Sequence, residues 1–228
     1  MRKVLSIIIV LALGLVSFQC AAKKMSEEEQ KALDTVIVTL KDGTVVNGVV
    51  KKYWTANHAS RYNTEFTMTD DNGKEVKVTT EDLDSIVFPL RPDSTLKVWR
   101  VYEFPSIKLF GKKGDVERWI AADLKHSEHA QVVVPNVRVN VPVGTRSQWI
   151  TTTWGCLRVE NDSICYPFFF DCEGGLNLKY LKKTLGKKRL ELVDHIEQWF
   201  KADKKRKKEL EKNYSFILEA VEDYYNQN

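Results

Sequence analysis

Hydrophobic and polar residues follow two different spacings along this chain. Between residues 35 and 170 they alternate in short runs, whereas beyond residue 174 apolar residues recur every three or four positions. Alternation is typical of strands with one buried face, and the wider spacing is typical of amphipathic helices. The pattern therefore predicts an α+β protein in which two β-rich units precede a helical region at the C-terminus.

The first β unit is predicted over residues 35–90. It holds five short runs separated by turn signals, and the Asp-Asn-Gly sequence at 71–73 is the strongest hairpin signal among them. Gly48 lies inside the long second run, where a strongly bent strand often requires a residue without a side chain. Five short strands, one of them bent, predict a small β-barrel.

The second unit, over residues 94–170, is predicted to be mainly β. Its run at 116–126 fits a short helix as well as a strand. Pro135 and Pro142 interrupt a later strand-like run, and proline suits strands at the edge of a sheet. We expect this unit to pack beside or onto the barrel.

The helical region covers residues 174–228. Two of its segments place apolar residues on one face, and the charged sequence at 201–209 separates them. The apolar positions are Leu192, Val193, Ile196, Trp199 and Phe200, followed by Leu210, Tyr214, Ile217, Leu218, Val221, Tyr224 and Tyr225. We expect a helical hairpin that packs on the β unit.

The N-terminus has the features of an export signal. Residues 1–22 begin with two basic residues, continue with an apolar stretch of about 15 residues and end in small residues. A bilayer-spanning helix takes about 20 apolar residues, and no second long stretch follows, so we expect no transmembrane helix in the mature chain. The protein is predicted to be exported, either secreted, periplasmic or tethered to the outer membrane.

Cys20 leaves the mode of processing open. Bacterial lipoproteins carry their lipid on a cysteine at this place, but Gln19 stands where they have a small residue. A lipid anchor at Cys20 and cleavage after Ala22 are therefore both retained. Residues 23–34 are polar and are predicted to form a linker, as a tether would require.

Charge does not favour nucleic acid as a partner. The whole chain carries +4 and loses Arg2 and Lys3 with the signal, which leaves +2. Lys179–Lys212 is locally basic, with 13 basic and 6 acidic residues, an excess of seven. Such a run is usually a solvated helix face or turn. The alternative is contact with an acidic lipid or polymer, which salt would weaken.

Three cysteines remain beyond the signal: Cys156, Cys165 and Cys172. An oxidising compartment favours a disulfide, and an odd number leaves one thiol unpaired. In a hairpin centred on residues 161–162, positions whose numbers add up to 323 face each other. Cys156 then faces Pro167 and is offset by two from Cys165, so a direct bridge between these two needs another register. Bonds from Cys172 to either cysteine stay open.

Histidines do not predict a metal site. His126 and His129 flank Glu128 as an i, i+3 pair, but no third ligand is evident and no Cys-x-x-Cys spacing occurs. We therefore expect exposed loop histidines and neither a metal nor another cofactor. His195, on a helix beside apolar positions, is expected to be structural.

The first unit resembles the Sm-like and SH3-like barrels. The residues that carry the resemblance are Leu40, Asp42, Gly43, Gly48 and the final turn and strand at 82–88. Sm-like proteins bind RNA, but this segment has no basic or aromatic cluster for it. Bacterial SH3-like modules outside the cytoplasm often bind cell-wall peptides, which implies a protein or cell-wall ligand by analogy of fold alone. The order of units is similar to that of exported bacterial proteins of unassigned function.

Residues 153–158 are similar to the active-site motif of L,D-transpeptidases, exported enzymes that cross-link peptidoglycan through a cysteine. Thr153, Gly155, Cys156, Leu157 and Arg158 match the motif, and Trp154 stands where the family has histidine. The resemblance implies that Cys156 is a nucleophile supported by Arg158. It also implies an upstream histidine, for which His126 and His129 are the candidates.

These observations lead to two main hypotheses. The first is an exported, non-enzymatic binding module of the cell envelope or the exterior that uses its β units to bind a protein or cell-wall ligand. The alternative is a cysteine-dependent, L,D-transpeptidase-like enzyme acting on peptidoglycan peptides, which requires Cys156 as a thiolate beside a histidine. A third hypothesis, a membrane-surface protein that uses the basic helices, predicts binding to vesicles that is lost at high salt.

Overall fold

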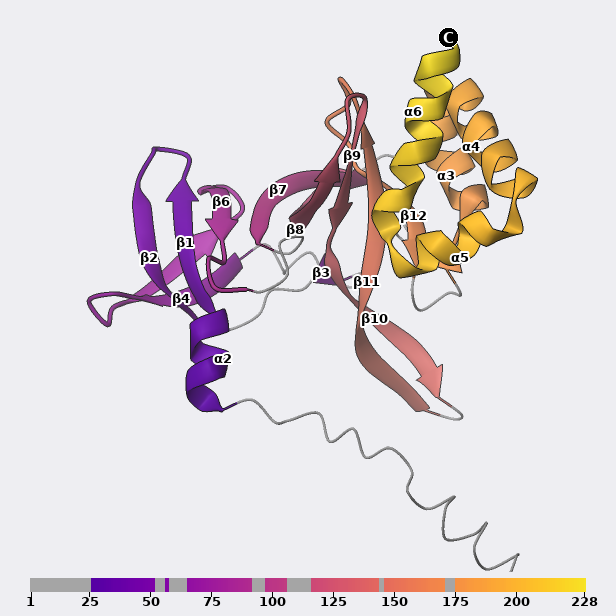
Figure 1. The fold of residues 1–228 in the computed structure, drawn as a ribbon. Coiled ribbons are helices and arrows are strands. Elements are labelled where there is room, and N and C mark those ends of the chain that lie inside the picture. The colour runs from indigo at the N-terminus through magenta and orange to yellow at the C-terminus, as the bar shows by residue number, and fades with distance from the viewer. Residues whose placement is uncertain are drawn as a thin grey trace, which may run out of the picture. The chain divides into compact units, whose positions relative to one another are not determined.

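The computed structural model describes residues 26–51, 56–57, 65–91, 97–105, 116–143, 146–170 and 175–228. They form an α+β protein with one large, mostly antiparallel sheet and several helices at the C-terminal end (Figure 1). The predicted signal peptide, Cys20 and Cys172 lie outside the described residues. The chain divides into two compact units, Met1–Ala32 and Leu33–Asn228.

Helix α2 (Glu27–Leu33) occupies part of the segment predicted as a linker. Ser26 and Glu29 form a capping box, in which Ser26 N donates to Glu29 Oε2 at 2.7 Å and Glu29 N donates to Ser26 Oγ at 3.1 Å. Three glutamates in the first turn also interact favourably with the helix dipole. These local signals are sufficient to begin a helix in a polar sequence.

The N-terminal half of the sheet contains the five runs predicted from alternation. They are β1 (Thr35–Leu40), β2 (Val45–Val50), β4 (Glu65–Asp70), β5 (Glu75–Thr79) and β6 (Leu83–Val87). The predicted turn at 71–73 joins β4 to β5, and Gly73 has a φ of 78°. The alternating pattern thus identified these five strands and the main hairpin, but not the two-residue strand β3 (Ala56–Asn57).

The predicted five-stranded barrel is corrected to part of a larger sheet. Strand β6 pairs with β1 on one side and with β7 (Val98–Pro105) on the other. Among the described residues, β5 is paired with β4 alone. The outer edge of β6 is therefore already occupied by a neighbour, and the sheet continues past it into the region predicted as the second unit.

The remaining strands extend the sheet in sequence order except for one insertion. They are β8 (Val116–His126), β9 (Ala130–Val134), β10 (Asn136–Val143), β11 (Arg146–Val159), β12 (Tyr166–Phe170) and β13 (Gly175–Leu176). The main path runs β13-β12-β11-β9-β8-β7-β6-β1-β2-β4-β5. Strand β10 pairs with β11 off this path and also pairs in parallel with β3 (Ala56–Asn57). The ambiguous run at 116–126 is thus a strand.

The β11–β12 hairpin has the predicted register beside its turn, and the register shifts by one between Gly155 and Cys156. Cys156 faces Pro167 and Leu157 faces Tyr166. Asn161 has a φ of 61° in the connecting turn, a conformation that asparagine adopts more readily than most residues. Cys156 and Cys165 are both free thiols, as their offset in this register requires.

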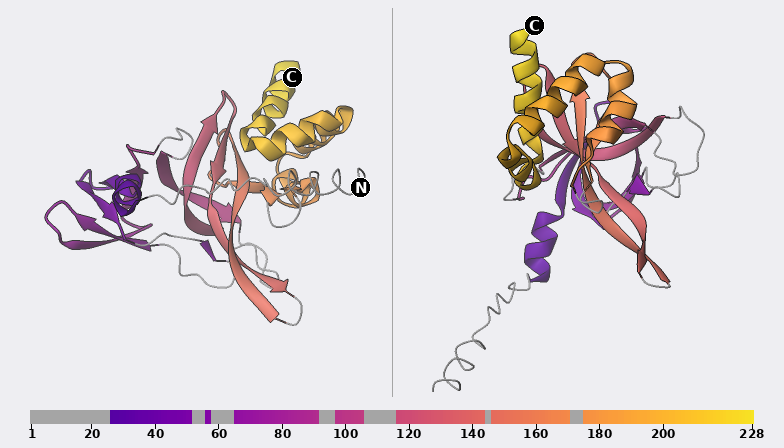
Figure 2. Two further views of the ribbon diagram at one scale, coloured as in Figure 1. Left: turned by 60° about the horizontal axis from the view of Figure 1, so that its bottom comes forward. Right: turned by 90° about the vertical axis from the view of Figure 1, so that its right-hand side faces the viewer.

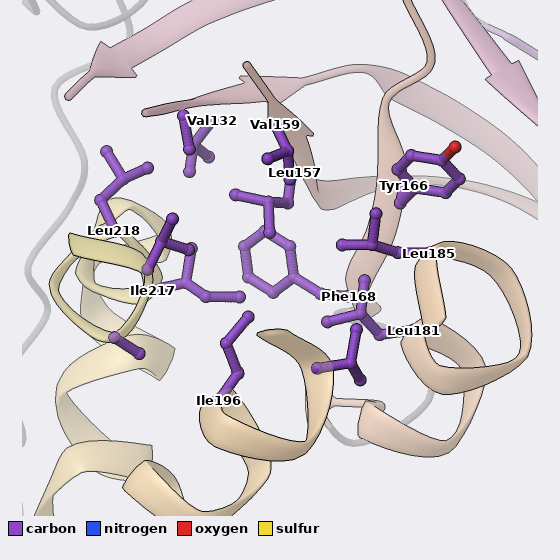
Figure 3. Packing of buried hydrophobic residues seen from close by; sticks show 14 of the residues in the cluster. Val132, Leu157, Val159, Tyr166, Phe168, Leu181, Leu185, Ile196, Ile217 and Leu218 are labelled. Carbon is purple, nitrogen blue, oxygen red and sulfur yellow. The ribbon is translucent and has the colours of Figure 1, made fainter. Parts of the chain in front are cut away.

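In the described part of the chain, three hydrophobic cores lie along the sheet. The N-terminal core contains residues of β1, β2 and β4–β8. The helix-facing core joins β9, β11 and β12 to the C-terminal helices, and its sheet residues include Val132, Leu157 and Phe168 (Figure 3). The opposite core, on the other face of the same strands, contains Val133 and Cys156. Strands β9 and β12 are buried along their whole length and contribute to both cores, which explains their largely apolar sequences.

The C-terminal region contains more helices than the predicted hairpin. They are α3 (Leu178–Thr184), η3 (Leu185–Lys187), α4 (Leu190–Ala202), α5 (Lys204–Lys212), η4 (Tyr214–Phe216) and α6 (Ile217–Gln227). Helices α4 and α6 carry the predicted apolar faces and pack against each other and the sheet (Figure 2). The charged sequence between them forms α5. None of the described helices is long and apolar enough to cross a membrane.

Candidate functional site

Cys156, the candidate nucleophile, lies inside the opposite core. Its side chain is 0% exposed, in a cluster that also contains Trp154 and Phe170. Burial and the neighbouring Cys165 raise the pKa of the Cys156 thiol well above its usual value. A thiol in this environment is protonated at neutral pH, and the protonated form is a poor nucleophile. The geometry therefore favours a packing role for Cys156.

The structure separates Cys156 from His129. Cys156 pairs with Val133 on β9, and His129 lies four residues away, just before that strand. Four residues of strand correspond to about 13 Å, well beyond hydrogen-bond reach. His126 lies on β8, where its exposed side chain places Nε2 3.9 Å from Asp123 Oδ2. Neither histidine is placed to deprotonate the thiol.

Arg158 belongs to a polar network that ties four strands together. Its Nη1 donates to Gln131 Oε1 at 3.5 Å, and Gln131 Nε2 donates to Tyr102 Oη at 2.7 Å and to Asp123 Oδ1 at 2.9 Å. Tyr102 also donates to Asp123, and burial together with this acidic neighbour raises the pKa of its phenol strongly. Arg100 Nε lies 3.3 Å from Asp123 Oδ2. The network satisfies its buried polar groups internally, as structural networks do.

Asp162 organises the turn after β11. Its carboxylate accepts from Ile164 N at 3.2 Å and Tyr166 Oη at 2.9 Å, and Lys188 Nζ lies 3.4 Å away. Burial alone would raise the pKa of Asp162, but the bonds from Ile164, Tyr166 and Lys188 lower it overall. Its backbone carbonyl accepts from Arg158 Nε at 2.9 Å. The arginine of the transpeptidase-like motif therefore also supports this turn.

His129 is held by the C-terminal helix. Its Nδ1 lies 2.7 Å from Glu222 Oε2, and its backbone N donates to Glu222 Oε1 at 3.0 Å. The imidazole stacks on Tyr225 with the ring centroids 4.2 Å apart. The bond to Glu222 raises the pKa of His129. The predicted loop histidine is thus half-buried and bound across 93 residues of sequence.

Asp223, which follows Glu222 on α6, forms a similar contact with a second histidine. His195 Nε2 lies 2.8 Å from Asp223 Oδ2, and the His195 ring contacts Tyr224 with the centroids 5.5 Å apart. The expectation that His195 is structural agrees with this contact between α4 and α6. Sequence reasoning overlooked Glu222 and Asp223, because two acids near the end of a helix are common on solvated faces.

The exposed side of the helices carries a basic surface. We call Lys204, Lys205, Lys207 and Lys208 the α5 lysine cluster, and all four side chains are exposed. Arg206, in the middle of this run, turns toward Trp199, donating to its carbonyl at 2.7 Å and lying 3.8 Å from the ring centroid. The other basic residues of α3 and α4 include Lys182 and Lys201, which form ion pairs within the helical region. All four lysines of the cluster lie on one short helix, where they concentrate positive charge that an external anion can reach.

Burial of Cys156 and Cys165 predicts that both thiols react slowly in the native protein. Cys156 and Cys165 are expected to react with iodoacetamide at least about 1,000-fold more slowly in the native protein than in urea, because reaction requires exposure of the thiol. Mass spectrometry of timed samples at about pH 6 and about pH 8 would measure both rates. Rapid labelling of native Cys156 at the lower pH would contradict the packing role and revive the nucleophile hypothesis.

The described residues thus offer three arrangements that could support a function: the polar network around Arg158, the contacts of His129 and His195 with acidic residues of α6, and the α5 lysine cluster. The first is internally satisfied, whereas the other two reach the surface. No protein-family model, curated protein or solved structure matches this chain.

Proposed function

We propose that this protein is an exported, non-enzymatic binding module of the cell envelope, and that it binds an anionic membrane surface through the α5 lysine cluster. The observation that carries the proposal is the concentration of exposed positive charge on one short helix. Export is inferred from residues 1–22, which lie outside the described residues.

The charge on α5 is unfavourable for the helix itself. Lysines at spacings of three and four repel one another, and each such pair costs about 0.2–0.5 kcal/mol. The first turn of α5 contains no acidic residue, so its lysines also face the positive end of the helix dipole. Asp203 offsets part of this as the N-cap, accepting from Lys205 N at 2.8 Å. An external anion would remove the repulsion that remains.

The alternatives receive less support from the geometry. Burial of Cys156 and its distance from His129 weigh against the transpeptidase-like enzyme. The β units, which we expected to hold a protein or cell-wall ligand, present no comparable concentration of like charge among their described residues. The helical surface is therefore the better candidate for a ligand.

We also propose that β6-β1-β2-β4-β5 has the strand arrangement of an Sm/SH3-like barrel that is opened by β7. The support is the order itself, in which the last strand flanks the first, together with the shared N-terminal core and the close approach of β2 and β4 at Gly48. This proposal concerns fold alone and implies no ligand.

Sedimentation with vesicles tests the membrane proposal. The mature chain is expected to bind vesicles of phosphatidylcholine and phosphatidylglycerol at low salt, and not vesicles of phosphatidylcholine alone. A basic residue near an anionic surface contributes about 1 kcal/mol, so changing all four lysines of the cluster to glutamine should weaken binding at least about 100-fold. Raising the salt toward about 1 M should have a similar effect by screening.

The matched control removes the same charge elsewhere. Changing Lys51, Lys74, Lys77 and Lys125 to glutamine, all exposed and all on the β units, should leave vesicle binding within about threefold of the unaltered chain. If both quadruple variants lose the same vesicle affinity, binding depends on the net charge of the protein and not on the α5 lysine cluster. Absence of binding to anionic vesicles at low salt would reject the membrane surface and direct the search to soluble anionic polymers.

A further inference from the structure

Three potential metal ligands meet where the β8–β9 turn contacts α6. Glu128 and His129 come from the turn, and Glu222 comes from the helix. One donor atom from each side chain lies within 4.8 Å of the other two. The sequence supplied Glu128 and His129 as neighbours, and the fold supplies the third ligand that spacing alone did not reveal.

Two of the three ligands are already oriented. Glu222 is fixed by two contacts with His129, at 2.7 Å to the ring Nδ1 and 3.0 Å to the backbone N. The imidazole is fixed in turn by its stacking on Tyr225, with an angle of 11° between the rings. Tyr225 accepts a hydrogen bond from Arg189 Nη1 at 3.1 Å. Preorganised ligands lose little conformational freedom on binding, which favours affinity.

We propose that Glu128, His129 and Glu222 bind one divalent transition-metal ion, for which Zn²⁺ is the appropriate probe. One imidazole nitrogen and two carboxylates, with a remaining position for water, form a donor set that suits Zn²⁺. In tetrahedral coordination with bonds of about 2.0–2.2 Å, two donor atoms lie about 3.3–3.6 Å apart. The exposed Glu128 carboxylate therefore moves inward, and Nδ1 and Glu222 Oε2 move slightly apart from their 2.7 Å contact. Where Nδ1 is the donor, the ion replaces the proton between Nδ1 and Glu222, and that proton is released to solvent.

Binding would connect two parts of the chain that are distant in sequence. Helix α6 contributes Ile217, Leu218 and Val221 to the helix-facing core, and Glu222 in its middle contacts the turn before β9. An ion bound by both elements stabilises the native state because the unfolded chain does not hold the three ligands together. The inference is independent of the α5 lysine cluster, which lies on a different helix.

Isothermal titration with Zn²⁺ tests the site in the full mature chain, without a polyhistidine tag and with Cys172 blocked by alkylation. We expect one equivalent of Zn²⁺ to bind and the unfolding temperature to rise in its presence. Glu128→Gln and Glu222→Gln should each weaken binding at least about tenfold, because each removes a charged ligand at nearly constant shape. Since Glu128 is exposed, its variant should retain the native circular dichroism.

His195→Gln is the matched control, because His195 forms a similar pair with the adjacent Asp223 on the same helix. It should bind Zn²⁺ as the unaltered chain does. The proposal is rejected if the unaltered chain binds no stoichiometric ion, or if Glu128→Gln binds as tightly as the unaltered chain. Equal weakening by His195→Gln would also reject it, since the ion would then bind elsewhere or without selectivity.

Discussion

Replacing Gly48 with alanine is expected to destabilise the protein by more than about 3 kcal/mol. A β-carbon on residue 48 would lie 2.1 Å from the carbonyl oxygen of Thr69 and 2.7 Å from Met68 Cε. The methionine side chain can move, but Thr69 O belongs to the backbone of β4, which pairs with β2 at this point. Relief of the overlap would require the two strands to separate and to lose ladder hydrogen bonds over a buried core.

Urea unfolding followed by tryptophan fluorescence would measure this loss. Gly186→Ala is a control with the same chemical change, because a β-carbon there would meet its nearest atom, Lys182 Cγ, at 3.5 Å, an ordinary contact. Its expected effect lies between no change and a gain of about 1 kcal/mol from reduced freedom of the unfolded chain. If Gly48→Ala unfolds at the same urea concentration as the unaltered protein, the close approach of β2 and β4 does not exist in solution.

Gly48 also illustrates how much of the fold the sequence predicts. A glycine inside an alternating run predicted a position without room for a side chain, and the structure shows that Thr69 of β4 occupies the space there. Alternation and turn signals identified the strands because these signals are local. Whether the first five strands close into a barrel could not be predicted in this way. It depends on which strand occupies the outer edge of β6, and that strand begins beyond residue 97.

In the candidate sites, too, local features could be predicted from the sequence and long-range contacts could not. The register of the β11–β12 hairpin follows from its turn, so the position of Cys156 opposite Pro167 was predictable. The burial of Cys156 was not, because it depends on residues of β7, β8 and β9 that cover it. The contact between His129 and Glu222 spans 93 residues, and no local pattern relates the two. The similarity of a six-residue motif to an active site is likewise local and does not establish which groups surround the cysteine.

Replacing Phe168 with alanine should cost about 3–5 kcal/mol, the usual range for truncating a fully buried phenylalanine. Phe168 is 0% exposed and lies at the centre of the helix-facing core, between Leu157 of β11 and Ile196 of α4 (Figure 3). The ring fills the space between sheet and helices, so its removal leaves a cavity that both layers border. Unfolding in urea should show the loss, and helix content should decrease first if the helical layer detaches.

A second substitution, at Gly155, tests whether the stability lost in Phe168→Ala comes from packing of the Phe168 ring against β11. A β-carbon at Gly155 would lie 2.9 Å from Phe168 Cζ and 3.2 Å from Phe169 Cβ, so Gly155→Ala alone should be destabilising. In the Phe168→Ala background the aromatic ring is absent, and the added methyl group enters the vacated space. The double variant should therefore be more stable than the sum of the two single changes predicts, by about 1–3 kcal/mol. Additive losses would mean that residues 155 and 168 do not share this contact, and the Phe168 ring would then not pack over Gly155 of β11.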